Sequence, residues 1–208
     1  GAFMSGVVLP DCPPPSFALA HSMGGLVLLR ALRAGQTWFS RVVLSAPMIA
    51  WGPTRPTQPT ACRIAATVTR LGLGWLSAHG EARDTIERTP FEKNDVTGDV
   101  ARYRRNADLA RDLPDLFVSG PTYGWLHAAC RAMRQAADLK FAAAIRVPAL
   151  FVAGSRENVV SLQAIQRFAA GMRAGTALTI PGGRHELLME QDAIRAQFWA
   201  AFDAFIPG

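Results

Sequence analysis

The sequence predicts an α/β protein, with a parallel β-sheet covered by helices on both faces and interrupted by a helical insertion. Short continuous apolar runs alternate with helix-compatible segments, which is typical of strands buried on both sides. One such run, 17–20, leads through a tight turn directly into a helix-compatible stretch, 26–34. Roughly 90 residues separate the second and third expected strands, many more than an ordinary α/β connection needs. These observations predict one α/β core that carries an inserted subdomain.

The core elements are expected in strand–helix order. Four short apolar runs are expected to form the strands: 17–20, 41–45, 147–153 and 176–180. Three longer segments with apolar residues at helical spacing are expected to form helices: 26–34, 161–172 and 190–206. Gly35 is placed to end the first helix, and Ser161 is placed to cap the second. Residues 1–47 and 141–208 therefore form the predicted core.

The insertion, residues 48–140, is expected to be a helical cap. A proline-rich stretch opens it at 51–59. Four helix-compatible segments follow: 62–75, 81–88, 100–111 and 124–139. Because helix-compatible sequence dominates it, we expect the insertion to form an inserted helical subdomain.

The composition indicates a globular protein and excludes several classes. Of the 208 residues, 50% are hydrophobic, which supplies a buried core and argues against a disordered chain. No uncharged apolar stretch reaches the ~18 residues of a membrane span. The net charge of +6 comes from arginines spread along the chain, and without a basic face or a recognisable module we expect no nucleic-acid partner. The same spread is compatible with a surface that tolerates anionic lipid headgroups.

The three cysteines, Cys12, Cys62 and Cys130, are expected to be reduced thiols. Their odd number and wide spacing fit neither a disulfide framework nor a C-x-x-C metal site. Reduced thiols agree with the cytoplasmic compartment, which we expect for this protein, with contact to membrane lipid at the periphery. No metal or organic cofactor is expected.

Ser22 is the first candidate for a chemical role. It lies in Ala20-His-Ser-Met-Gly24, where the first strand turns sharply into a helix. Such a turn raises a serine Oγ at the carboxyl end of the sheet, and it needs small residues such as Ala20 and Gly24 two positions on either side. Free backbone N–H groups at the helix start, notably that of Met23, can bind a developing oxyanion. The alternative is a coincidental serine in a glycine-containing loop, and the flanking strand and helix favour the nucleophile.

A serine hydroxyl needs a base to take its proton, and four histidines are available. His21 adjoins Ser22 on a rigid turn, so its side chain is expected to leave in another direction. His79 and His127 fall in the insertion, where a surface or packing role is expected. His185 follows the fourth strand in a glycine-rich loop before the last helix, where a base would reach such a serine. We therefore interpret His185 as the base.

The acid that orients the base should follow the preceding strand. The third strand is followed by Gly154-Ser-Arg-Glu-Asn158, whose only carboxylate is Glu157. Taken alone, Glu157 fits a solvated loop charge that pairs with Arg156 better than it fits a catalytic acid. Its position at the carboxyl end of a strand, upstream of His185, favours the acid.

At these segments the chain resembles the α/β-hydrolase fold, and within it the lysophospholipase and monoacylglycerol-lipase-like group related to serine aminopeptidases. The similar segments are the elbow at 19–25, the acid loop at 154–160, the histidine loop at 184–186, and the insertion motifs at 90–103 and 120–125. The resemblance implies Ser22 as nucleophile, His185 as base and Glu157 as acid of a catalytic triad.

The chain departs from the family pattern in three places. Ala20 stands where the family usually has Gly, and Glu157 stands where it usually has Asp. The family's N-terminal half, which supplies the first strands and the loop with the second oxyanion donor, has no counterpart, since residues 1–10 resemble only the end of the helix before the nucleophile strand. We therefore expect the activity to depend on a donor upstream of this chain.

The resemblance implies a serine carboxylic-ester hydrolase that acts through an acyl-enzyme on a single-chain acyl lipid, either a lysophospholipid or a monoacylglycerol. Trp51 and Trp125, with Trp75, are expected to line the acyl-binding cap, and packing within the cap is the alternative role of each. A small-ester esterase or an aminopeptidase on the same fold stays open, because a fold does not fix a substrate. A non-catalytic binding fragment of this fold is the remaining alternative.

Overall fold

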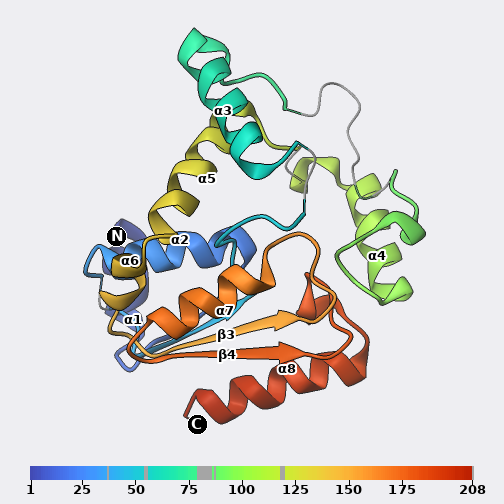
Figure 1. Cartoon of the computed structure of the whole chain (residues 1–208). Helices are drawn as coiled ribbons and strands as arrows, with labels where there is room; N and C mark the ends of the chain where they lie inside the picture. The colour runs from blue at the N-terminus through green and yellow to red at the C-terminus, as the bar shows by residue number, and fades with distance from the viewer. Residues whose placement is uncertain (37, 54–55, 79–85, 87, 118–119, 208) are drawn as a thin grey trace.

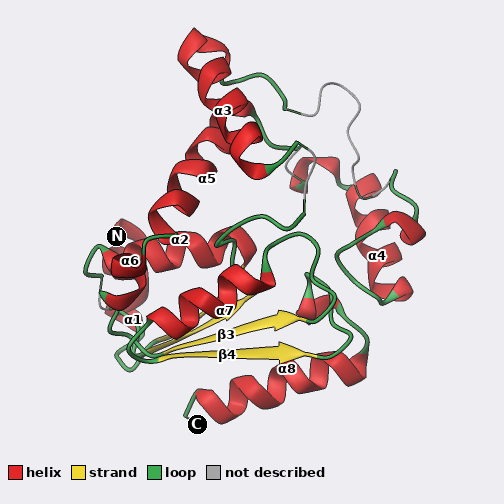
Figure 2. Ribbon diagram, in the orientation of Figure 1, coloured by secondary structure: helices red, strands yellow, loops and turns green. Residues whose placement is uncertain are grey.

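The core of the molecule is a parallel sheet of four strands in the order β1-β2-β3-β4. Figure 2 labels two of them, β3 and β4, and shows the sheet between helices. The computed structural model describes residues 1–36, 38–53, 56–78, 86, 88–117 and 120–207. The strands are β1 (Phe17–His21), β2 (Arg41–Ser45), β3 (Ala149–Gly154) and β4 (Gly175–Ile180). The predicted parallel sheet is confirmed. β3 begins two residues later than predicted, because Pro148 has no N–H to donate to the sheet.

The two faces of the sheet pack against different helices (Figure 1). Val42 and Leu44 of β2 belong to the large apolar cluster with α2 (Ser22–Arg33) and α7 (Leu162–Gly171). Val43 faces the other way and packs in the cluster that contains Phe198 of α8 (Asp192–Phe205). Because strand side chains alternate between faces, a strand covered on both sides is apolar at consecutive positions, as Val42, Val43 and Leu44 are.

The ends of the core helices follow the predicted capping residues. Gly35 has a φ of +88° just after α2, a conformation that glycine adopts without strain. The Ser161 hydroxyl accepts the N–H of Ala164 and caps α7. Before β1 the chain forms the short helical turns η1 (Met4–Val8) and α1 (Leu9–Asp11), so residues 1–10 are largely helical as expected.

Between β2 and β3 the chain forms mostly helices. They are α3 (Gln58–Val68), η2 (Thr69–Leu73), η3 (Phe91–Lys93), α4 (Val100–Asp112), η4 (Pro114–Leu116), α5 (Tyr123–Ala136) and α6 (Leu139–Ala143). Three of the predicted segments correspond to α3 with η2, to α4 and to α5, whereas most of the predicted 81–88 helix lies outside the described residues. The second half of α5 packs into the same apolar cluster as α2. Of the helices described, none is both long and apolar enough to cross a membrane.

The prediction of three reduced thiols is wrong for two of them. Cys62 of α3 and Cys130 of α5 form a disulfide, with their Cα atoms 5.7 Å apart, and Cys12 is free and exposed. The sequence separation of 68 residues concealed this pair, because α3 and α5 become neighbours only through packing (Figure 1). Since disulfides persist in oxidising compartments, the cysteines no longer support a cytoplasmic location.

Candidate active site

Three of the predicted side chains meet at the carboxyl edge of the sheet. The Nε2 atom of His185 lies 3.0 Å from the Oγ of Ser22, and its Nδ1 lies 2.9 Å from Glu157 Oε2. Ser22 follows β1, Glu157 follows β3 and His185 follows β4. Parallel strands bring their carboxyl ends to one edge, so residues up to 163 positions apart converge there. Both distances are those of hydrogen bonds.

Ser22 lies on a constrained turn. Its φ is +50°, in the left-handed region that residues with a Cβ rarely adopt. The position that must be small is Gly25, one residue later than predicted. A Cβ added at Gly25 would lie 2.8 Å from the Cβ of Pro47, whereas a Cβ added at Gly24 would have no described atom within 4 Å. Met23 follows Ser22 in the first turn of α2, where backbone N–H groups have no partner within the helix.

Both carboxylate oxygens of Glu157 are engaged. Oε2 faces the imidazole of His185, while Oε1 accepts the backbone N–H groups of Val159 at 2.8 Å and Val160 at 3.1 Å. The side chain is 0% exposed. A solvated charge paired with Arg156, the alternative considered from the sequence, does not describe this environment.

The loops that carry Glu157 and His185 are locked together by their backbones. A Cβ at Gly154 would overlap the carbonyl oxygen of Gly183, so the two chains touch there. The N–H of Arg156 donates to that same oxygen at 2.9 Å, and the N–H of Gly182 donates to the Ser155 hydroxyl at 2.9 Å. These contacts fix where the acid stands relative to the imidazole.

His21 lies closer to the site than the sequence indicated. Its ring centroid is 4.7 Å from that of His185, and its Nδ1 lies 3.4 Å from the hydroxyl of buried Ser45. Burial, and secondarily the nearby His185, lower the pKa of His21 to about 4. Its imidazole is therefore neutral at neutral pH, and the low pKa makes it a poor base. That His21 packs against His185 could not be predicted from its position next to Ser22 in the sequence.

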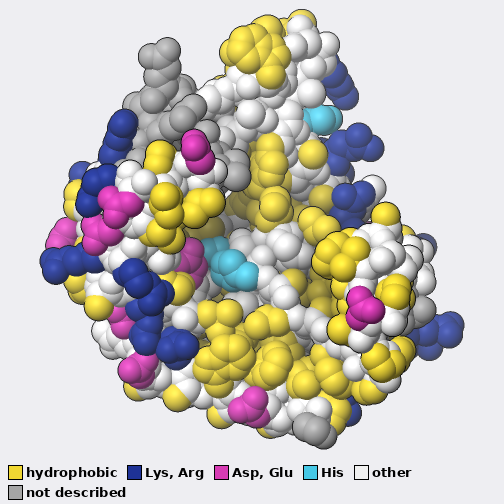
Figure 3. Space-filling model, turned by 180° about the vertical axis from the view of Figure 1, so that it is seen from behind, with side chains coloured by type: hydrophobic (Ala, Val, Ile, Leu, Met, Phe, Trp, Pro, Cys, Tyr) yellow, Lys and Arg dark blue, Asp and Glu magenta, His cyan; other side chains and the backbone are white. Residues whose placement is uncertain are grey.

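Two of the three predicted tryptophans share an apolar cavity. Trp51 and Trp125 line a space of about 570 Å³ together with Ile64, Tyr123, Leu126 and Val159. Trp125 also borders a smaller space of about 130 Å³ next to Met23, the neighbour of Ser22. Trp75 is 72% exposed and does not line the cavity. In Figure 3 a histidine side chain lies at the base of a hollow bordered by hydrophobic side chains.

The remaining candidates lie elsewhere. His127 is on α5, half-buried, and His79 falls outside the described residues. Within the described parts of the chain, no three side chains of His, Cys, Asp or Glu are grouped as metal ligands.

The sequence is similar to a known family over most of its length. Residues 3–192 match the family described as serine aminopeptidase, S33. Lysophospholipase L2 of Escherichia coli K12 is 32% identical over 209 aligned positions, which cover 94% of this chain and 58% of that protein. The chain thus spans little more than half the length of this curated relative.

Solved structures share the fold at lower identity. A soluble variant of the monoglyceride lipase from Saccharomyces cerevisiae, in complex with a substrate analog, has a TM-score of 0.70 at 19% identity, covering 92% of this chain and 64% of that one. The monoacylglycerol lipase of Paleococcus ferrophilus has a TM-score of 0.70 at 18% identity, with coverages of 95% and 70%. The predicted α/β-hydrolase fold is confirmed, and with residues 3–192 matched, the chain belongs to the serine aminopeptidase S33 family.

Proposed function

We propose that this protein is a serine hydrolase that cleaves the ester bond of a single-chain acyl lipid. The observation that carries the proposal is the continuous pair of hydrogen bonds from Glu157 through His185 to Ser22. Glu157 accepts the Nδ1 proton of His185, which leaves the Nε2 lone pair facing the serine hydroxyl. The names of the relatives, a lysophospholipase and monoglyceride lipases, support a lipid ester as the substrate.

In this mechanism, Ser22 Oγ bonds to the ester carbonyl carbon while His185 takes the hydroxyl proton. The N–H of Met23 is one donor to the resulting oxyanion. The bond to the leaving alcohol then breaks, the imidazolium returns its proton to that alcohol, and an acyl-enzyme remains. Water attacks the acyl-enzyme with His185 again as base, releasing a fatty acid and regenerating Ser22.

We propose that residues 48–140 form a cap that binds the acyl chain. Trp51 and Trp125 line the larger cavity, and Trp125 and Met23 border the smaller one, so apolar walls extend toward the nucleophile. Each buried CH₂ group contributes about 0.8 kcal/mol, so a long acyl chain gains several kcal/mol that a short ester lacks.

This proposal predicts a preference for long acyl chains. The kcat/KM for lysophosphatidylcholine or monoolein is expected to exceed that for a short-chain nitrophenyl ester, with an aminoacyl nitroanilide at background. Trp125→Ala is expected to raise the KM for the long substrates about tenfold while changing the short ester little, because it removes apolar wall. Trp75→Ala, on an exposed side chain outside the cavity, is the matched control. Preference for the short ester, or for the aminoacyl substrate, would contradict the lipid assignment.

We further propose that the protein docks peripherally on anionic membrane lipid through a basic hollow. A space of about 510 Å³ between α2 and the end of α5 is lined by Arg30, Arg33, Arg134 and Lys140. None of the ion pairs among the described residues involves these four side chains. The acidic residue at this hollow, Asp138, accepts the backbone N–H of Lys140.

Vesicle sedimentation tests this docking. Binding is expected for phosphatidylcholine vesicles that contain phosphatidylglycerol, weakening as salt is added, and is expected to be weak for phosphatidylcholine alone. Replacing Arg30 and Arg33 by Gln removes two positive charges, each of which contributes about 1 kcal/mol to the free energy of membrane binding. Binding should therefore weaken about 30-fold. Gln at the exposed Arg104 and Arg105 of α4 is the control pair. Equal binding to both vesicle types would overturn the proposal.

A further inference from the structure

We propose that Glu190 is a positioning residue. Its carboxylate keeps the His185 imidazole within hydrogen-bonding distance of Ser22 by binding the loop that carries His185, and it connects that loop to segment 94–99 of the insertion. The inference rests on the proposed function, in which His185 is the base. Glu190 touches neither Ser22 nor His185 through a hydrogen bond, so its effect passes through the backbone.

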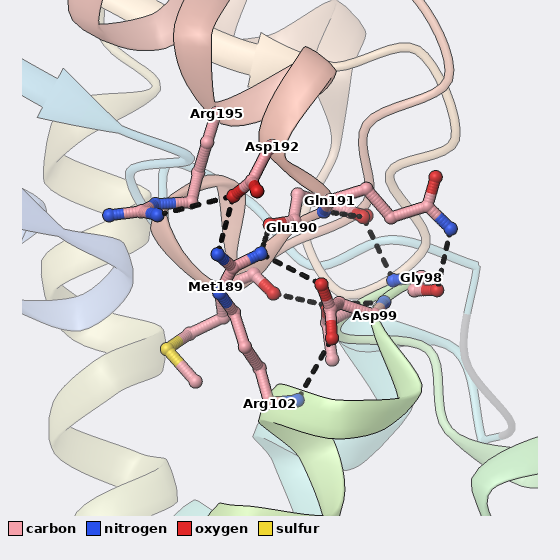
Figure 4. A network of polar contacts seen from close by, with 9 residues as sticks. Gly98, Asp99, Arg102, Met189, Glu190, Gln191, Asp192 and Arg195 are labelled. Carbon is pink, nitrogen blue, oxygen red and sulfur yellow. Dashed lines mark hydrogen bonds and ion pairs between the residues drawn. The ribbon is translucent and has the colours of Figure 1, made fainter.

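The Glu190 carboxylate is completely buried and bound by backbone N–H groups from both segments. Figure 4 shows those of Gly98 and Gln191. Its Oε1 accepts the N–H of Arg184, the residue directly before His185, at 2.9 Å. Its Oε2 accepts the N–H of Gly98 at 3.0 Å and of Gln191 at 3.3 Å. Among the residues that the structure describes, no cation forms an ion pair with this carboxylate. A buried charge needs such hydrogen bonds to offset lost hydration, so losing any one of them is costly.

Other bonds connect the same two segments on both sides of His185. The Glu186 N–H donates to the Val96 carbonyl at 2.8 Å. The Arg184 guanidinium donates to the carbonyls of Asn94 at 2.9 Å and Thr97 at 3.0 Å. The Thr97 hydroxyl donates to the Met189 carbonyl at 2.7 Å. The histidine loop is therefore held by segment 94–99 on one side and by the acid loop on the other.

Arg102, in the first turn of α4, forms hydrogen bonds to residues on both sides of this cluster. Its guanidinium donates to the carboxylate of Asp99 at 2.7 Å, to the Glu190 carbonyl at 2.6 Å and to the carboxylate of Asp192 at 2.5 Å (Figure 4). The hydrogen bond and charge of Arg102 hold the pKa of Asp192 below its usual range. Arg102 thus joins the start of α4 to the backbone of Glu190 and to the start of α8.

The consequence for catalysis follows from the geometry of proton transfer. A displacement of about 1 Å between a base and the group it deprotonates can reduce the rate on the order of 100-fold. Since Arg184 directly precedes His185, releasing the Arg184 N–H lets the imidazole shift away from Ser22. Segment 94–99 would move with the same loop, because the one carboxylate binds both.

Glu190→Gln tests the proposal with almost no change of shape. The amide has a single acceptor oxygen, so its NH₂ group must face either the Arg184 N–H or the Gly98 and Gln191 N–H groups. We expect turnover per active site to fall 10- to 100-fold, and the rate at which fluorophosphonate reacts with Ser22 to fall by the same factor. The KM for a short ester should change less than threefold. Active sites are counted by fluorophosphonate titration, and Glu92→Gln, at an exposed carboxylate, is the control.

A merely structural role would lower the thermal midpoint and the number of titrated sites but leave turnover per titrated site unchanged, and that result would overturn the proposal. If Glu190→Gln does not fold, Gly98→Ala decides the question, because its Cβ would lie 2.9 Å from Glu190 Oε2. Turnover per site equal to the parent in that variant would then overturn it. A parent protein that fails to react with fluorophosphonate would instead reject the proposed function, so the two failures are distinguishable.

Discussion

Ser22→Ala is expected to abolish covalent labelling by a fluorophosphonate and to lower ester hydrolysis about 10⁴-fold or more. The alanine has no Oγ to attack the carbonyl carbon or the phosphorus, and the imidazole 3.0 Å away then has no proton to remove. The fold should survive, because alanine is smaller than serine and the turn already holds a residue with a Cβ at a φ of +50°. Labelling is measured by in-gel fluorescence and hydrolysis by fatty acid release.

Ser40→Ala is the matched control for this variant. Ser40 is exposed just before β2, and its replacement should leave both labelling and turnover at the level of the parent. A Ser22→Ala protein that labels as well as the parent would show that the reactive group is another residue.

Glu157→Gln is expected to lower kcat/KM about 10³- to 10⁴-fold without unfolding the protein. Oε1 accepts two backbone N–H groups, so the amide oxygen of Gln will take that position and the NH₂ group will face His185 Nδ1. Nδ1 must then accept a hydrogen bond, which moves the ring proton to Nε2. An Nε2 that already carries a proton cannot take one from Ser22.

The measurement compares kcat/KM for one ester, with circular dichroism to show that the fold is kept. Asp108→Asn is the control, because Asp108 is an exposed carboxylate of α4 that lies outside the loops of the site. Unimpaired turnover of Glu157→Gln would place the orienting acid at another residue.

The positions of the three candidate catalytic residues could be predicted from the sequence, because each follows the end of a predicted strand. Ser22, Glu157 and His185 each follow a strand directly, and the parallel sheet fixes that these positions share an edge. The central strands were predictable because β3 is buried at every position and β2 at four of its five, so both contain continuous apolar runs. The outer strand β4 is largely exposed and gave a weaker pattern.

Features that depend on packing between distant segments were not predictable from local patterns. The Cys62–Cys130 disulfide requires that α3 and α5 lie side by side, and the Glu190 carboxylate meets Gly98 across 92 positions. A weak signal for Glu190 was present, since an acidic residue that ends the run Leu187-Leu-Met must either turn outward or find buried donors. Which of these occurs depends on the segment that packs against it.

The disulfide also has a mechanical consequence for the cavity. Ala61 and Ile64 belong to the wall formed by α3, and Trp125 and Leu126 belong to the wall formed by α5. Cys62 and Cys130 crosslink these two helices, so these two parts of the wall are covalently joined. A covalent bond in this way limits how far two parts of the cavity wall can separate.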